Sequence, residues 1–143
     1  MIDTVDLARR IRRHAVEMTH LGKSSHVGSV LSMTDIIAVL YGCVMRFDPA
    51  NTKWPDRDRF ILSKGHAATS LYVALEYKKF INEKDLRSYT KKKSLLEEHP
   101  SPKLDLDISF SNIFLSSVST KYPFLSIIFL KSCIAISYLY RRF

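Results

Sequence analysis

The chain has 143 residues, of which 46% are hydrophobic and 25% charged, so it can form one soluble domain with a buried core. Its net charge is +8, but the basic residues fall in separate short groups that no nucleic-acid-binding motif connects, so we expect no nucleic-acid partner. The N-terminal segment lacks the apolar stretch of a signal peptide, which favours a cytoplasmic protein.

The first expected element is an amphipathic helix. Asp3 or Thr4 can cap its start, and apolar residues recur at close to helical spacing as far as Leu21. Basic residues lie mostly between these apolar positions, so one face should be buried and the other solvated. Gly22 lies where a left-handed C-cap would end the helix.

A loop and a second helix are expected next. The segment 23–31 is mostly polar or small, and it predicts a loop. Ser32 and Asp35 have the spacing of a capping box, and apolar residues on most sides predict a deeply buried helix over about 33–45. Cys43 lies in this pattern, so we expect a buried, reduced thiol there.

The middle of the chain predicts a strand followed by two helices. The short apolar run 60–62 indicates a buried strand, and the segment 63–66 a turn from strand to helix. A third helix should span about 67–80, and Asn82 can cap a short fourth helix that ends near Tyr89.

The composition changes after about Lys103. Residues 105–143 contain no glycine and a single alanine, and Ser, Ile, Leu, Phe and Tyr dominate. Three interpretations are open: a β-prone segment that completes the core, a weak membrane anchor, or sequence unrelated to the preceding domain, as a change of reading frame would produce. The mismatch with the upstream pattern favours the third. We therefore predict two regions, 1–103 and a divergent apolar tail over 104–143, which is a candidate non-native continuation.

Five sequence blocks between Leu7 and Pro102 carry a resemblance to a known family. They are, in order, Ser25-His26-Val27-Gly28-Ser29, the run Asp35 to Tyr41, Asp48-Pro49, the run Arg57 to Ala67 with Lys64-Gly65-His66, and His99-Pro100. Together they resemble the N-terminal, thiamine diphosphate-binding section of transketolases, above all the small N-terminal subunit of split enzymes. The resemblance implies an α/β fold with helices around an incomplete parallel sheet, mostly helical as it stands.

The same resemblance implies functional residues. His26 matches the histidine near the reacting carbons and the substrate hydroxyls, which gives it catalytic and substrate-binding roles. His66 matches a catalytic histidine that contacts the diphosphate of the cofactor, and Gly65 lets the backbone approach the cofactor at that turn. His99 matches a histidine that reaches the substrate cavity. Imidazoles suit this chemistry because their pKa lies near neutral pH.

One family motif is absent. Transketolases hold Mg²⁺, and through it the diphosphate, with a Gly-Asp-Gly motif and a later asparagine; here no glycine follows Gly65, so we predict no metal ligand in this chain. The implied function is two-carbon ketol transfer between sugar phosphates, by a truncated chain that is inactive alone. The implied partner is a C-terminal transketolase subunit or a second protomer. Alternatives are a non-catalytic helical interaction module and, with weaker support, a basic membrane-associated protein.

Overall fold

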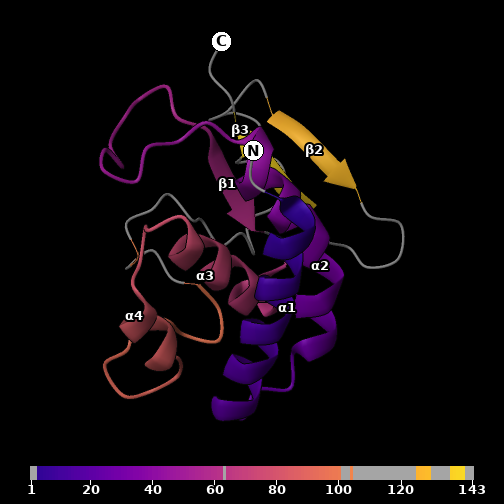
Figure 1. Cartoon of the computed structure of the whole chain (residues 1–143), viewed down its shortest axis with the longest axis vertical. Helices are drawn as coiled ribbons and strands as arrows, with labels where there is room; N and C mark the ends of the chain where they lie inside the picture. Colours follow the sequence, from indigo (N-terminus) through magenta and orange to yellow (C-terminus); the bar gives the residue numbers. More distant parts are fainter. Residues whose placement is uncertain (1–2, 63, 101–103, 105–124, 130–135, 141–143) are drawn as a thin grey trace.

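Helices make up most of the computed structural model, which describes residues 3–62, 64–100, 104, 125–129 and 136–140 (Figure 1). The elements are α1 (Thr4–Leu21), α2 (Val27–Val39), the π-helical turn η1 (Leu40–Val44), β1 (Arg59–Leu62), the 3-10 turn η2 (Gly65–Ala67), α3 (Ala68–Tyr77), α4 (Glu83–Arg87), β2 (Leu125–Phe129) and β3 (Ile136–Tyr140). Helices α1, α2 and α3 pack against one another and form the core, and the strands gather at one end of it.

The first helix follows its predicted pattern but ends differently. The side chain of Asp3 caps α1 by accepting a hydrogen bond from the backbone N–H of Val5 at 2.8 Å, and the predicted apolar face is buried as far as Met18. The predicted left-handed cap at Gly22 is wrong, because Gly22 has φ −79° and the following Lys23 takes the positive φ of 51°. Gly22 is needed for space instead, since a Cβ atom there would lie 2.6 Å from the Tyr89 ring.

The second helix starts earlier than predicted. It begins at Val27 rather than near Met33, so the expected loop ends at His26. Burial explains the difference: Val30 is fully buried, and the gain from such contacts outweighs the weak helix propensity of glycine and serine in this segment. The predicted capping box does not form, because the Ser32 hydroxyl donates to the Ser29 carbonyl within the helix.

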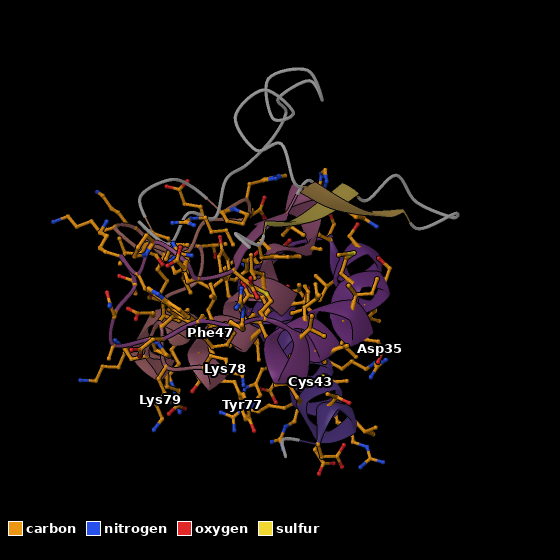
Figure 2. All side chains as sticks on the ribbon, turned by 90° about the horizontal axis from the view of Figure 1, so that it is seen from above. Asp35, Cys43, Phe47, Tyr77, Lys78 and Lys79 are labelled. Atoms are coloured by element: carbon orange, nitrogen blue, oxygen red, sulfur yellow. The ribbon has the colours of Figure 1, made fainter. Side chains whose placement is uncertain are left out.

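Cys43 is exposed, so the prediction of a buried thiol is wrong (Figure 2). It lies in η1, where the backbone N–H of Met45 donates to the carbonyl of Leu40 at 2.9 Å, five residues back. This wider turn shifts the helix face relative to the regular period on which the prediction rested.

The predictions for the middle of the chain are confirmed with adjusted ends. Strand β1 covers the predicted apolar run, and η2 forms the turn into α3. Every residue of α3 from Ala68 to Leu75 is buried, which makes it the central helix rather than one with a single apolar face. Asn82 caps α4 through a full capping box with Asp85.

The described strands form one antiparallel sheet in the order β1-β3-β2. Arg59 pairs with Tyr140, and Leu125 pairs with Tyr140 on its other side. The expected incomplete parallel sheet is therefore not found among these strands. Parallel pairing requires a long crossover connection, whereas β2 and β3 follow each other closely enough to pair as neighbours. Most of the predicted tail, 104–143, lies outside the described residues, and its boundary stays a prediction.

One described helical stretch, Val27–Val44, is long and apolar enough to cross a membrane. A core helix of a soluble protein has the same property, and Val30 and Ile37 are fully buried here. The stretch therefore gives only weak support to a membrane-associated protein.

Candidate functional site

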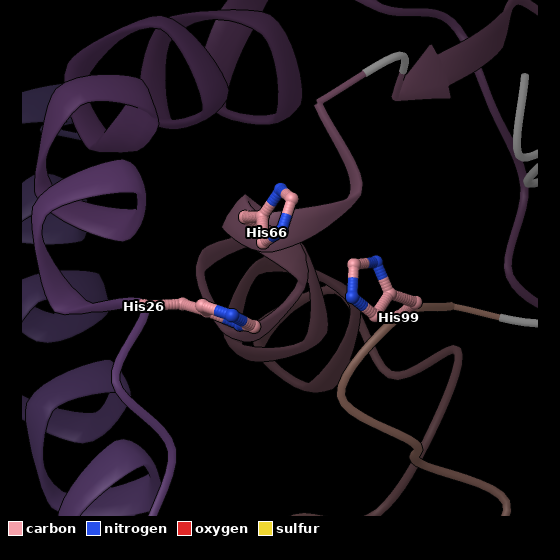
Figure 3. Close-up of side chains that lie close together, drawn as sticks. All are labelled: His26, His66 and His99. Atoms are coloured by element: carbon pink, nitrogen blue, oxygen red, sulfur yellow. The ribbon is translucent and has the colours of Figure 1, made fainter. Parts of the chain in front are cut away.

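Three histidines from distant parts of the sequence converge at one place, and we call His26, His66 and His99 the histidine cluster. Figure 3 shows their rings pointing toward one another from three separate segments. The ring centroids are 4.4 Å apart for His26 and His66, 4.8 Å for His66 and His99, and 5.7 Å for His26 and His99. The three side chains that the resemblance singled out individually thus form a single group.

His26 is placed by the tight connection between α1 and α2. The backbone N–H of Ser24 donates to the carbonyl of Thr19 at 2.9 Å, which ties the connection to the end of α1. His26 is the N-cap residue of α2, and its carbonyl accepts from the N–H of Val30, but its side chain does not cap the helix. The ring is half-buried, and its Nδ1 atom is buried without a hydrogen-bond partner among the described residues.

His66 is placed by the 3-10 turn between β1 and α3. Gly65 and Ala67 are buried on either side of it, so the turn anchors the backbone while the His66 ring remains exposed. The N–H of Ala67 donates to the carbonyl of Lys64 at 2.9 Å and closes the turn. Helix α2 packs directly on η2, which fixes the distance between His26 and His66.

His99 follows a loop that is tied to the core. Leu96 is fully buried, and its carbonyl accepts from the N–H of Thr90 at 3.0 Å. The hydroxyl of Tyr72, in the central helix α3, donates to the carbonyl of Glu97 at 2.9 Å. These contacts fix the chain two residues before His99, whose ring is exposed.

The surroundings of His66 lower its pKa from the ordinary value of 6.5. Partial desolvation of the ring is the first cause, and repulsion by the neighbouring imidazoles of His26 and His99 comes next. The ammonium group of Lys64 acts in the same direction, and the carboxylate of Glu98 opposes them. A lowered pKa keeps His66 neutral at pH 7, so the ring can accept a proton.

The sequence did not indicate a polar link beside the cluster. The Nζ atom of Lys64 donates to the Ser32 hydroxyl on α2 at 3.1 Å, which connects the turn before His66 to the helix that follows His26. Lys64 adjoins the Gly-His pair, but nothing in the sequence pointed to Ser32 as its partner. The histidines His14 and His20 lie on α1, and neither has a ring contact with the cluster.

Three imidazoles at these distances can donate and accept hydrogen bonds around one ligand and can transfer protons near neutral pH. Backbone N–H groups at the starts of η2 and α2 lie in the same region, where they favour an anionic group. The arrangement therefore suits a ligand that combines hydroxyl groups with an anion.

Comparison with known proteins gives a consistent result. The family model of the transketolase, thiamine diphosphate binding domain matches residues 4–109. Transketolase-like protein 2 of Mus musculus is 42% identical over 99 residues, which cover 69% of this chain and 16% of that protein. Human transketolase is 39% identical over 98 residues, covering 68% of this chain and 16% of the enzyme. An apulose-4-phosphate transketolase subunit of Phocaeicola vulgatus is 36% identical over 101 residues, covering 70% and 36%.

The chain thus spans between about a sixth and about a third of the length of these relatives. The matched region contains all three members of the histidine cluster, and the family is consistent with the expected α/β fold class. The resemblance seen in the five sequence blocks is confirmed, and the chain belongs to the family of transketolase, thiamine diphosphate binding domains.

Proposed function

We propose that this chain provides the imidazole side of a thiamine diphosphate site that transfers two-carbon ketol units between sugar phosphates. The convergence of His26, His66 and His99 within 5.7 Å, measured between ring centroids, is the observation that carries the proposal. Two relatives support the reaction class by name, since one is a transketolase and another a transketolase subunit for apulose 4-phosphate. The cytoplasm is the proposed compartment.

The residues present fit one side of such a cofactor. His66 and Gly65, at the start of η2, would hold the diphosphate, and the buried, unpartnered Nδ1 atom of His26 leaves the cluster with hydrogen-bonding capacity for a ligand. When bound, thiamine diphosphate supplies the electron sink that makes the carbon–carbon bond of the ketose cleavable.

The histidines would act on the substrate by orienting it and moving protons. His26 and His99 flank the space next to His66, so they can hydrogen-bond hydroxyls of a sugar phosphate from two sides. His66, whose lowered pKa leaves it neutral at pH 7, can accept a hydroxyl proton and return it. The exchange of protons between rings and substrate hydroxyls needs no large movement of the backbone.

The remaining part of the site would come from another polypeptide segment. No glycine follows Gly65, so the Gly-Asp-Gly motif that holds Mg²⁺ in the family is absent from this sequence. A diphosphate faced only by imidazoles and helix N-termini lacks the charge that a divalent cation provides. We therefore propose that a C-terminal transketolase subunit or a second protomer completes the site, and that the chain alone is inactive.

A chimera tests the proposed function directly. Residues 4–100 of this chain would replace the matching segment of human transketolase, and ketol transfer would be measured in the purified chimera. We expect transfer to be retained, and H26N or H66N in the chimera to lower kcat/KM by about 100-fold, the loss typical of a missing proton-transfer group. H20N, which changes an exposed histidine of α1, should leave kcat/KM unchanged.

The proposal would be wrong if the folded chimera kept full activity without either imidazole, or if H20N were equally damaging. Calorimetric titration of this chain with thiamine diphosphate and Mg²⁺ tests the need for a partner separately. We expect no binding tighter than about millimolar, and micromolar binding would show that the chain needs no partner for the cofactor.

A further inference from the structure

We propose that the histidine cluster is also a binding site for a transition-metal cation that prefers imidazole ligands, with Zn²⁺ as the representative ion. This role differs from that of Mg²⁺ in the family, because Mg²⁺ takes oxygen ligands whereas imidazole suits Zn²⁺, Cu²⁺ and Ni²⁺. The proposal concerns only residues of this chain and needs neither the cofactor nor a partner.

The geometry of the cluster is close to that of a three-histidine zinc site. One ligand nitrogen from each ring lies within 4.8 Å of the other two. In a tetrahedral site with Zn–N distances of about 2.0–2.1 Å, the ligand nitrogens are about 3.3 Å apart. The rings therefore have to approach one another by at most about 1.5 Å. Side-chain rotation can provide this movement, because His66 and His99 are exposed and α2, η2 and the loop after Leu96 hold their backbones in place.

An unsatisfied atom in the cluster provides a second indication. The Nδ1 atom of His26 is buried and has no hydrogen-bond partner among the described residues, and a buried polar atom in this state costs free energy. A cation held between the rings would give the imidazole of His26 a strong interaction. His26 and the two exposed rings then provide three protein ligands, and a fourth position stays open to water, as in zinc sites that are not closed.

The charged neighbours allow a cation. Lys64 is the unfavourable charge near His66, but its ammonium group is hydrogen-bonded to the Ser32 hydroxyl. Glu98 lies on the other side in the sequence from Lys64 and places a carboxylate near the same ring. If the proposed function is correct, the metal occupies the space that cofactor and substrate need, so Zn²⁺ and sugar phosphate would exclude each other.

The test uses the full chain without a histidine tag, after treatment with a chelator. ZnCl₂ is titrated into the protein while the histidine side-chain resonances are followed by NMR. We expect saturation at one equivalent, with shifts for His26, His66 and His99 and none for His14 and His20. Co²⁺ in place of Zn²⁺ should give the intense visible absorption of a tetrahedral site. Shifts spread over all five histidines, or none in the cluster, would overturn the proposal.

Variants give the second measurement. H26N, H66N and H99N should each lower the Zn²⁺ affinity by at least about tenfold, since even residues that only support metal ligands have effects of this size. H20N is the matched control and should leave the affinity unchanged. Far-UV circular dichroism checks the fold of each variant, and the NMR titration of the unaltered chain decides the matter if a variant does not fold. Equal losses in H20N, or full affinity in the triple variant, would show that the cluster is not the site.

Discussion

The ring of His66 lies between two other imidazoles, with centroid distances of 4.4 Å to His26 and 4.8 Å to His99. Its pKa is lowered first by partial desolvation and then by repulsion from these rings, so removing one of them should raise it. We expect H26N to raise the pKa of His66 toward 6.5, as measured by an NMR pH titration. H20N should leave it where it is in the unaltered chain.

The lowered pKa also links the stability of the fold to pH. The unfolded chain takes up the proton of His66 before the folded chain does, so the contribution of His66 to stability is complete above pH 6.5. It is lost as the pH falls through the folded pKa, and the loss is small because the ring is exposed. Urea unfolding at about pH 7.5 and about pH 5.5 should therefore show a smaller difference for H66N than for the unaltered chain. An equal difference would mean that other groups cause the dependence.

At the level of secondary structure, local signals predicted most elements. The cap at Asp3, the capping box at Asn82 and the apolar run of β1 each lie within a few residues, so the sequence alone could indicate them. The start of α2 depends instead on the burial of Val30 between other helices. No local pattern contains that contact, and the glycine and serines around it favour a loop when they are read without it.

The end of α1 packs closely against the segment after α4, which makes Gly22 sensitive to substitution. A Cβ atom at Gly22 would lie 2.6 and 2.8 Å from two carbons of the Tyr89 ring. Tyr89 is buried and its ring contacts that of Tyr72, so it cannot move aside freely. We expect Gly22→Ala to lower the free energy of unfolding by about 1–3 kcal/mol, as overpacking does, measured by urea denaturation.

Gly28 provides the matched control for this substitution. It lies in the first turn of α2, and a Cβ atom there would meet nothing within 4 Å. Gly28→Ala should therefore leave the stability unchanged or raise it by up to about 1 kcal/mol, because alanine favours a helix more than glycine does. If both variants lost the same stability, packing against Tyr89 would not be the reason for Gly22.

Across the whole molecule, the sequence could name the members of the histidine cluster but not their arrangement. The resemblance identified His26, His66 and His99 one by one, from motifs in separate parts of the chain. Their mutual distances depend on the packing of α2 on η2 and on the bond from Tyr72 to the loop before His99. These are contacts between residues far apart in the chain, so no periodicity or spacing contains them.

The relation between the tail and the core is open to a direct experiment. The buried residues of α1, α2 and α3 all come from before residue 104, whereas β1 pairs with β3 from the tail. A chain that ends at Leu104 should therefore keep its helices and its cooperative unfolding, because Phe60 and Leu62 still anchor β1 by their burial. The backbone amides of β1 that pair with β3 should exchange faster with solvent, while those of α3 remain protected.

Hydrogen exchange followed by mass spectrometry measures both regions in one sample, with the full chain as the reference. Loss of protection confined to Arg59–Leu62 would support the predicted boundary near residue 103, because the helical core would then be independent of the tail. Loss of protection in α3 as well would contradict it. The central helix would then depend on the tail for its stability, and residues 104–143 would be a genuine part of the core.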